Sequence, residues 1–386
     1  MTHPQHDAVI VGAGPAGLAA ALALRHAGLD AICVGPAPAP GRPDRRTTAL
    51  LHGSVRFLTG LGVWERLRPH AAPLAALRLI DRTGRLFRAP DTAFEASEIG
   101  QEAFGYNIPN AILTATLFDA LGTGFVPSTG VSGIQQDGAG ARLALADGHE
   151  VSARLVVGAD GRQSFCREAA GIGTRSWAYD QTATVCDFAH GRPHGGACTE
   201  FHYSGGPFTV VPLPGGNSSL VWVERPAEAA ALAALGDAEF AAAIAARLDG
   251  LLGEITEVGP RSSFPLSGLI AKKLTAERLA LVGEAGHVMP PIGAQGLNLG
   301  FRDVADLARC IAGATDPGAP DVLAAYEAAR RGDVLTRTLA ADLLNRTLTS
   351  GLLPLQLARG AGLMALSLAG PLRRAAMRRG MAAAGA

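Results

Sequence analysis

Residues 7–28 constrain the fold of this chain most strongly. An apolar strand at 7–11 leads directly into Gly12-Ala13-Gly14-Pro15-Ala16-Gly17, and an alanine- and leucine-rich helix follows and ends near Gly28. This is the GxGxxG pattern in the strand–turn–helix context that binds dinucleotides. Gly12 permits the tight turn, Gly14 lets the backbone approach a pyrophosphate, and Gly17 lets helix and strand pack closely. The pattern predicts a Rossmann-like α/β domain rather than a simple glycine turn.

The second strand of this domain departs from the usual pattern. It covers residues 31–34 and ends in Gly35-Pro36, where a dinucleotide fold normally places an acid that holds the ribose hydroxyls. Asp30 stands at the wrong end of the strand to replace that acid. A proline- and glycine-rich loop follows at 37–43. We expect Arg46, just beyond this loop, to contact the cofactor; the alternative is an ordinary surface arginine.

The length and composition indicate a globular protein of two domains. The chain has 386 residues, of which 48% are hydrophobic and 18% are charged, which argues against disorder. Its net charge is zero, so we expect no nucleic-acid partner. The five cysteines form no CxxC pair, which indicates reduced thiols. We see no targeting segment and no apolar run long enough to span a membrane, and we expect a cytoplasmic location.

Strand patterns in the middle of the chain indicate a second sheet. Residues 76–87 predict a hairpin that turns at Arg82-Thr83-Gly84, and residues 182–223 alternate like an antiparallel sheet. A helix at 110–121 and hairpins at 131–157 return to the first domain. A polyalanine helix is predicted at 227–248, and another helix at 321–331. We therefore assign residues 1–75, 105–175 and 265–345 to the dinucleotide domain. Residues 76–104 and 176–264 form an inserted antiparallel substrate domain, and 346–386 form a C-terminal helical tail.

Two later strands each deliver a carboxylate to a turn. The strand at 154–157 leads into Gly158-Ala159-Asp160-Gly161, and the strand at 279–282 leads into Gly283-Glu284. Taken alone, Asp160-Gly161 is most often only a turn. The second carboxylate is followed by a more specific arrangement, which begins with the stiff segment Met289-Pro290-Pro291-Ile292.

A glycine-rich loop, Gly293-Ala294-Gln295-Gly296, then opens a helix. The apolar stripe of this helix consists of Leu297, Phe301, Val304, Ala308 and Ile311. A helix N-terminus behind glycines presents free N–H groups and the positive end of a dipole. We therefore expect an electron-rich group to bind there.

The tail at 351–386 has a different character. It holds five arginines and no acidic residue, and residues 361–372 carry no charge. A basic, apolar helical tail can bind an anionic membrane surface or a protein partner. The alternative is a helix folded back over its own domain. In the first case the protein is peripheral to the inner membrane.

The three motifs GAGPAG (12–17), GADGRQSFCR (158–167) and GEAGHVMPPIGAQGLN (283–298) together resemble those of the class A FAD-dependent aromatic hydroxylases. With RTTALLHGSVRFLTGLGVW (46–64) and the start of the tail at 344–363, the chain is most similar to the ubiquinone-biosynthesis hydroxylases. The resemblance covers nearly the whole chain. It implies an FAD-binding domain of the p-hydroxybenzoate hydroxylase type with the substrate sheet inserted.

The resemblance also implies roles for particular residues. Those expected to bind FAD are Gly12, Gly14, Ala16, Gly17, Arg46, Asp160, Glu284, Gly293, Gln295, Gly296, Leu297 and Asn298. Asp160 belongs to a motif that serves both FAD and the nicotinamide donor in this family. Glu284 stands where the family usually has aspartate, bonded to the ribityl chain. Tyr203, Pro290 and Pro291 are expected to line the substrate pocket, and His287 is expected to be structural rather than a base.

The implied reaction is hydroxylation of the ring of a polyprenylated phenol. Reduced FAD, with NAD(P)H as reductant, adds O2 at C4a, and the activated phenol attacks the resulting hydroperoxide. The helix N–H groups at 296–298 stabilise the negative charge of the reduced ring without a lysine or arginine. We therefore expect neither a catalytic triad nor a metal.

Three other functions are compatible with the motifs. The chain could hydroxylate another phenol, act as a flavin reductase or halogenase of the same fold, or serve as a flavin-binding scaffold in a biosynthetic complex. No WxWxIP motif occurs, which argues against a halogenase. The intact glycines and both carboxylate motifs argue against an inactive scaffold.

Overall fold

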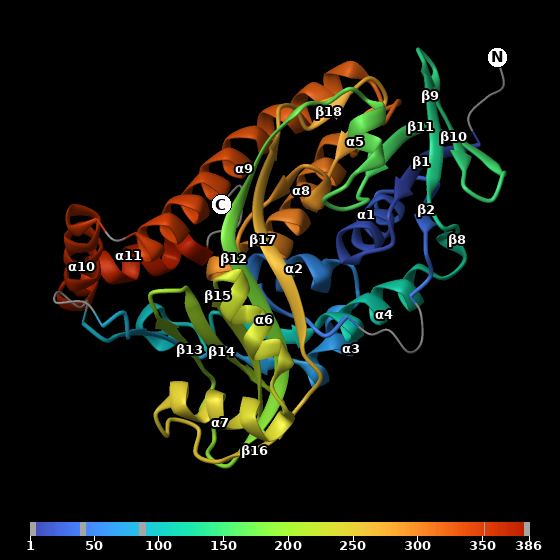
Figure 1. Cartoon of the computed structure of the whole chain (residues 1–386). Coiled ribbons are helices and arrows are strands. Elements are labelled where there is room, and N and C mark those ends of the chain that lie inside the picture. Colours follow the sequence, from blue (N-terminus) through green and yellow to red (C-terminus); the bar gives the residue numbers. More distant parts are fainter. Residues whose placement is uncertain (1–4, 39–43, 85–89, 351, 382–386) are drawn as a thin grey trace.

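Two large sheets form the body of the protein, and three long helices extend from it at the C-terminal end (Figure 1). The structure is a computed structural model, and it describes residues 5–38, 44–84, 90–350 and 352–381. The chain passes between the two sheets several times, so each domain is assembled from separate segments of the sequence.

The first sheet is the predicted nucleotide-binding sheet. Its described strands are β1 His6–Val11, β2 Ala31–Gly35, β8 Phe125–Pro127, β9 Val131–Asp137, β10 Gly140–Leu145, β11 Glu150–Gly158, β18 Thr275–Ala276 and β19 Leu279–Leu281. They run in the order β18-β19-β11-β1-β2-β8, and β9 and β10 form a hairpin beside β11. The pairings from β19 to β8 are parallel. The carboxyl ends of β1, β11 and β19 therefore meet at one edge, where the three predicted motifs begin.

Both faces of this sheet are buried, as is usual for parallel sheets. Ala8 and Ile10 pack under helices α1 Pro15–His26, α4 Asn110–Leu121 and α8 Gln295–Ile311. The alternate residues Val9 and Val11 pack with side chains of β10 on the opposite face. Alternation along one apolar strand thus supplies both halves of the core.

The second sheet is antiparallel apart from one parallel pair. Its described strands are β5 Ala76–Asp81, β6 Thr92–Glu95, β12 Thr174–His190, β13 Ala197–His202, β14 Pro207–Leu213, β15 Asn217–Glu224, β16 Ile255–Val258, β17 Ser262–Ala271 and β20 His287–Val288. They run in the order β20-β17-β12-β15-β14-β13-β5-β6, with β16 beside β12. The parallel pair is β13 and β5. Strand β12 is 17 residues long, which is long enough to run from the nucleotide-binding domain into the second sheet.

The two faces of the second sheet have different surroundings. Helices α6 Pro226–Ala234 and α7 Asp237–Leu248 cover one face, where Phe208 and Trp222 pack against Phe240 (Figure 1). The other face meets the first domain through a small sheet of β3 Thr47–Leu51, β7 Gly105–Pro109 and β4 Ala72–Pro73. At this contact the Thr47 hydroxyl donates a hydrogen bond to the Ser219 hydroxyl, 2.9 Å away. Three short helices complete the described body: α2 His52–Gly60, α3 Trp64–Leu67 and α5 Phe165–Ala169.

The C-terminal part is helical, and its first helix is longer than predicted. The helix expected at 321–331 is α9 Pro320–Thr349, followed by α10 Leu353–Leu368 and α11 Gly370–Met381. The predicted helix ends at Arg331, but the next residue, Gly332, faces open space and the buried face continues through Val334, Thr338 and Ala341. In the part of the chain that is described, no single helix could cross a membrane. Only α9 and α10 together reach the required length and apolarity, and they are bent by 117°.

Two other sequence predictions differ from the structure. The helix predicted at 227–248 is divided into α6 and α7, because Leu235 is extended and the Gly236 N–H donates to the Glu239 carboxylate, 3.0 Å away, to begin a new helix. The return strand of the hairpin at 76–87 is β6, which begins only at Thr92; residues 85–87 lie outside the described residues. The boundaries drawn at 175/176 and 264/265 fall inside β12 and β17, which run through both domains as continuous strands.

Candidate cofactor site

In the glycine-rich turn after β1, two glycines leave no room for a side chain and one borders open space. A Cβ at Gly12, whose φ is +115°, would lie 2.3 Å from the Ala159 oxygen, and a Cβ at Gly17 would lie 1.8 Å from the Gly12 oxygen. No heavy atom lies within 4 Å of the place a Cβ would take at Gly14. Gly12 and Gly17 are therefore required for packing, whereas Gly14 leaves space above the turn for a ligand.

Ala16 lies at the junction of three elements rather than in open space. Its Cβ would be 3.3 Å from a Cβ added at Gly283 and 3.7 Å from one added at Gly300. Gly300 belongs to α8, and Gly283 begins the turn that carries Glu284. Ala16 was predicted to bind FAD, and the structure places it where α1, α8 and the Glu284 turn meet.

The end of β2 is packed against the glycine-rich turn. A Cβ at Gly35 would lie 2.9 Å from the Ala13 nitrogen and 3.1 Å from the Ala13 Cβ. Any side chain at this position would therefore require the turn to shift. Asp30, at the other end of the strand, is bonded to His6. The structure thus offers a steric reason for the missing acid, and Asp30 does not replace it.

Glu284 and Arg46 are brought together from distant parts of the sequence. Within residues 279–288 Glu284 alone is exposed, and its carboxylate makes no hydrogen bond to a described residue. Arg46 is bonded to Asp44 with an Nη2–Oδ2 distance of 2.7 Å, and its guanidinium lies 5.6 Å from the centroid of the Phe264 ring. The pKa of Arg46 is raised, first by the hydrogen bond to Asp44 and also by the charge of Glu284. Both charged groups therefore border the same space.

The loop before α8 has the conformation that its glycine predicts. Pro290 is buried and Pro291 is exposed. Gly293 and Ala294 both have positive φ, 66° and 54°, so the chain turns sharply before the helix begins at Gln295. A Cβ at Gly296 would meet no atom within 4 Å. The helix start is therefore accessible at this position.

The side chains at the start of α8 hold the loop in place. Asn298 is buried; its Oδ1 accepts from the Leu51 N–H and the Ser54 hydroxyl, and its Nδ2 donates to the Ala49 oxygen. Gln295 bonds to the Gly293 oxygen and accepts from Arg337, and Leu297 packs against the core. No side chain caps the helix. The N–H groups of residues 294–297 are therefore without helical partners, whereas that of Asn298 closes the first helical bond.

Asp160 is engaged within its own motif. Its Oδ1 accepts from the Ser164 hydroxyl at 2.5 Å, and its Oδ2 accepts from the Cys166 N–H at 2.9 Å. Arg167, in the same short helix, donates to the Ala285 oxygen beside Glu284. In this structure Asp160 therefore fixes the start of α5, and Arg167 ties that helix to the Glu284 turn.

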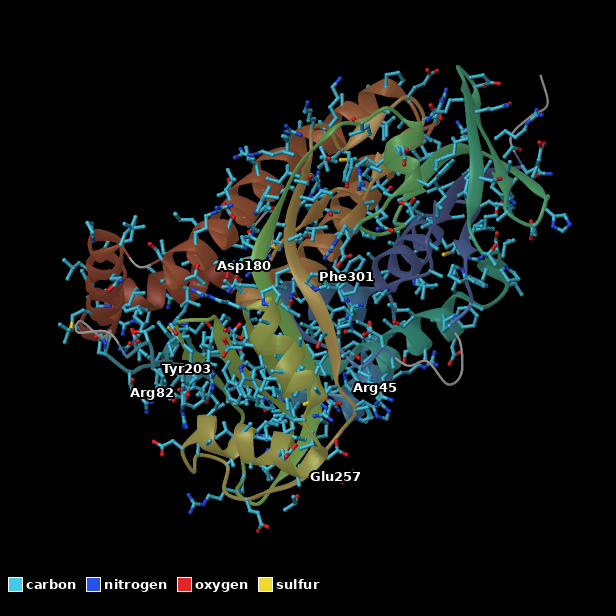
Figure 2. All side chains as sticks on the ribbon, in the orientation of Figure 1. Arg45, Arg82, Asp180, Tyr203, Glu257 and Phe301 are labelled. Atoms are coloured by element: carbon cyan, nitrogen blue, oxygen red, sulfur yellow. The ribbon has the colours of Figure 1, made fainter. Side chains whose placement is uncertain are left out.

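Tyr203, expected to line the substrate pocket, lies on the helix-covered side of the second sheet. Its hydroxyl donates to the Arg247 oxygen in α7, and the Arg247 guanidinium lies 3.9 Å from its ring centroid. Figure 2 shows it well away from Phe301 of α8. The structure does not bring Tyr203 together with Glu284 or Arg46: Tyr203 follows β13, which ends at His202, and packs against α7.

A buried charged group behind the site was missed from the sequence. Asp303, on α8, is fully buried and contacts His287 and Arg330, which are also buried. Burial opposes ionisation of Asp303, but the charges of His287 and Arg330 outweigh it, so the pKa of this carboxyl lies below its ordinary value. His287 is structural, as predicted. The available signal was an aspartate within the apolar pattern of α8.

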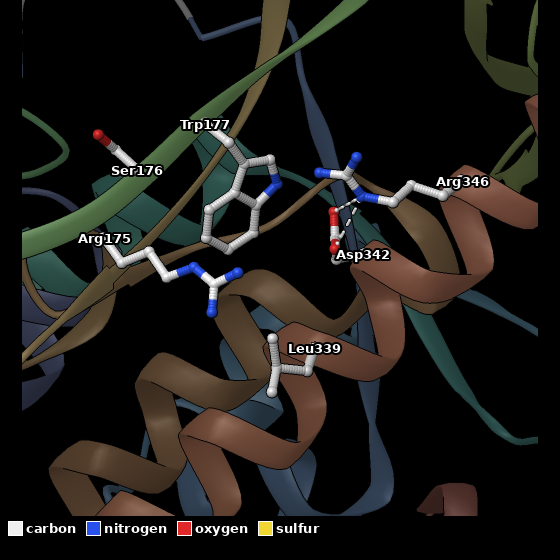
Figure 3. A pocket seen from close by; sticks show the side chains of 6 residues that line it. All are labelled: Arg175, Ser176, Trp177, Leu339, Asp342 and Arg346. Atoms are coloured by element: carbon white, nitrogen blue, oxygen red, sulfur yellow. Dashed lines mark hydrogen bonds and ion pairs between the residues drawn. The ribbon is translucent and has the colours of Figure 1, made fainter.

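Two small cavities lie outside the residues assigned to the cofactor. One, of about 80 Å³, lies between β12 and α9 (Figure 3). It is lined by Arg175, Ser176, Trp177, Leu339, Asp342 and Arg346. A second, of about 70 Å³, lies between α2 and α8. Neither is lined by Gly14, Glu284 or Arg46.

Comparison with known proteins agrees with this arrangement. Residues 5–340 match the family described as FAD binding domain. The ubiquinone hydroxylase UbiL of Rhodospirillum rubrum is 39% identical over 97% of this chain and 89% of its own length. The 3-demethoxyubiquinol 3-hydroxylase of Escherichia coli is 32% identical over 98% of this chain and 99% of its own length. The chain belongs to the FAD-dependent ubiquinone hydroxylase family. It is an FAD-dependent monooxygenase.

Solved structures confirm the predicted fold class. p-Nitrophenol 4-monooxygenase PnpA of Pseudomonas putida superposes with a TM-score of 0.79 at 19% identity, over 98% of this chain and 99% of that one. HpxO of Klebsiella pneumoniae, complexed with FAD and uric acid, gives 0.79 at 20% identity, over 100% of this chain and 98% of that one. Identities this low establish the shared fold alone.

The residues of this ubiquinone hydroxylase family member fit FAD. The open position at Gly14 suits the pyrophosphate, the free Glu284 carboxylate suits a sugar-like hydroxyl, and the uncapped start of α8 suits the electron-rich edge of the ring. When bound, FAD accepts electrons from NAD(P)H and activates O2. The chain itself supplies orientation and charge.

We predict that substitutions at two glycines of this turn have different effects, one on FAD binding and the other on folding. Gly14→Ala should leave the thermal stability of the FAD-free protein unchanged, because the new Cβ enters open space and the φ of Gly14, −74°, suits alanine. FAD affinity should fall about tenfold, or about 1.4 kcal/mol, because the methyl group occupies ligand space. Thermal unfolding and FAD titration measure the two effects.

Gly17→Ala is the matched control for this prediction. Its Cβ would overlap the Gly12 oxygen, so it should lower the stability of the FAD-free protein by several degrees. Equal stability of the two variants, or wild-type FAD affinity in Gly14→Ala, would contradict the assignment.

Proposed function

We propose that this enzyme hydroxylates an aromatic ring carbon of a polyprenylated phenol in ubiquinone biosynthesis. The phenol, O2, NAD(P)H and a proton give the hydroxylated phenol, water and NAD(P)⁺. The observation that carries the proposal is the convergence of Gly14, Glu284 and the start of α8 in a chain 39% identical to a protein named as a ubiquinone hydroxylase. The substrate class named for that relative is the basis for the substrate class proposed here.

The electrostatic arrangement suits a cofactor that becomes negatively charged on reduction. The N–H groups of residues 294–297 lack helical partners, and no side chain caps them. The positive end of the α8 dipole therefore faces the position proposed for the ring. Backbone dipoles held by the fold need no reorganisation when charge develops, which is the advantage of a preorganised site.

The sheet face that meets the first domain suits an apolar substrate. Val185, Val221 and Val211 share the face of Ser219, since residues paired across the strands, or two apart along one strand, point the same way. The same pairing places Asp187 and Thr209 on this face, so the valines lie beside two polar side chains. Ser219 bonds to Thr47, which follows Arg46 directly. We propose that this valine face is the wall along which the prenylated ring binds, in place of the wall expected from Tyr203.

The proposed reaction predicts which compound accumulates without the enzyme. A strain lacking the gene should build up a polyprenylated phenol that is one ring hydroxyl short of the next intermediate, and its ubiquinone level should fall. Mass spectrometry of the extracted quinones and precursors measures both. The wild-type gene should restore the profile, whereas a gene carrying Gly14→Ala should restore less of it at limiting FAD. A normal ubiquinone level with no accumulated phenol would contradict the pathway.

We further propose that α10 and α11 hold this cytoplasmic enzyme on the anionic surface of the inner membrane. Large apolar side chains are exposed along the two helices: Leu352, Leu355, Leu357, Met364, Leu368 and Leu372. Residues 351–386 contain no acidic residue. Arg373 is bonded to Glu98 on the body of the protein; beside it Arg374 is half-buried and Arg378 is exposed. Apolar burial together with basic charge is the combination that gives stable surface binding.

Vesicle binding tests the membrane proposal. The wild-type enzyme should co-sediment with vesicles containing phosphatidylglycerol more than with neutral phosphatidylcholine vesicles. Arg374→Glu with Arg378→Glu should remove that preference, because each basic residue near the surface contributes about 1 kcal/mol, and Leu368→Glu should weaken binding to both. Arg66→Glu, on the exposed surface of α3, is the matched control.

Other outcomes would decide against the membrane. Unchanged sedimentation of the tail variants would favour helices that only cover their own domain. Loss of a protein complex in cell extracts, without any change in vesicle binding, would favour a protein partner.

A further inference from the structure

We infer that Asp303, His287 and Arg330 form a positioning cluster that holds the Gly283-Glu284 turn in the geometry that binds FAD. None of the three was expected to touch the cofactor, and their effect on it passes through the turn. The inference therefore assigns part of the FAD affinity to residues outside the site.

Asp303 is bonded directly to the backbone of the turn. Its Oδ2 accepts from the Gly283 N–H at 3.0 Å and from His287 Nε2 at 2.6 Å, and its Oδ1 accepts from Arg330 Nε at 2.8 Å. Asp303 and Arg330 are fully buried, and His287 is 2% exposed. Both carboxylate oxygens thus have fixed partners. The Gly283 N–H is held by an acceptor that cannot rotate away without leaving buried charges unpaired.

The turn has little room to move. Gly283 has φ +60°, which favours glycine, and a Cβ at Gly300 of α8 would lie only 3.3 Å from the Gly283 Cα. Ala16 of the glycine-rich turn contacts the same point. The turn is therefore held between α1 and α8, and the hydrogen bond from the Gly283 N–H to Asp303 restricts its movement further. Glu284 follows at the next position, so its direction depends on this contact.

Helix α9 extends the cluster from behind. Arg330 also pairs with Asp306 and Asp333, at 3.1 and 2.9 Å. One helical turn earlier, the Tyr326 hydroxyl donates to the Leu281 oxygen, 2.7 Å away, at the end of β19. Two side chains of α9 therefore brace the strand and the turn that carry Glu284. This arrangement gives α9 a role in cofactor binding although it lies behind the site.

A purely stabilising role would need no such geometry. Apolar side chains of similar volume can stabilise a core as well as buried ions do. Only an acceptor at the position of Asp303 can satisfy the buried Gly283 N–H. Asp306 offers the contrast, since it also pairs with Arg330 but does not contact the turn. Substitutions at the two aspartates therefore distinguish an effect on the position of the turn from an effect on the stability of the protein.

The test compares Asp303→Asn with Asp306→Asn in the full-length enzyme. Each purified protein is freed of FAD and titrated with FAD by fluorescence, and its thermal unfolding is recorded with and without FAD. Both variants should lose stability without FAD. Asp303→Asn should bind FAD about tenfold or more weakly, and the visible spectrum of the bound flavin should shift. Asparagine has one acceptor oxygen where the partners of Asp303 use two, so it cannot accept from both Arg330 and the Gly283 N–H, and the turn should be displaced. Asp306→Asn should bind FAD like the wild type.

Equal FAD affinity in Asp303→Asn and the wild type, or equal losses in the two variants, would overturn the inference. If Asp303→Asn does not fold, His287→Ala and His287→Gln replace it. Glutamine keeps an N–H donor for Asp303, so it should restore most of the FAD affinity that alanine loses. Wild-type affinity in His287→Ala would overturn the inference.

Discussion

The contact between the Asp303 carboxylate and the Gly283 N–H is the interaction on which the cofactor site depends. It joins α8, whose start faces the proposed ring position, to the turn that carries Glu284. The same turn contacts Ala16, in the glycine motif after β1. The glycine motif at Ala16, the turn at Gly283 and helix α8 at Asp303 are thereby fixed at one point. The charged side chains behind them make that point rigid, because no member of the cluster can move without leaving a buried charge unpaired.

The two departures from the family pattern both concern the sugar portions of FAD. Glu284 is one methylene longer than the usual aspartate, and it is free and exposed at the end of a rigid turn. At Gly35 the close approach of Ala13 leaves no room for a side chain without movement of the turn. The pyrophosphate and ring positions follow the ordinary pattern. Differences in cofactor binding between this enzyme and its relatives should therefore arise along the ribityl chain and the adenosine ribose.

Much of the fold could be predicted from the sequence, because it depends on local patterns. The strand–glycine–helix unit at 7–28, the helix at 110–121 and the start of α8 were all encoded by apolar periodicity and glycine positions. The site was predictable where a glycine or a turn determined it. The position of Tyr203 was not predictable, because it depends on where β13 ends and on how α7 packs against the sheet, which the local sequence does not contain. Asp303 and Arg330 were missed because their pairing joins two helices 27 residues apart.

The proposed reaction transfers one oxygen atom from O2 to the ring of a polyprenylated phenol. The decisive measurement is turnover of the purified enzyme under ¹⁸O2 with FAD, NAD(P)H and the phenol that accumulates in the deletion strain. Mass spectrometry should show one ¹⁸O atom in the new ring hydroxyl and none from labelled water. A product that takes its oxygen from water, or NAD(P)H oxidation with no hydroxylated product, would contradict the account.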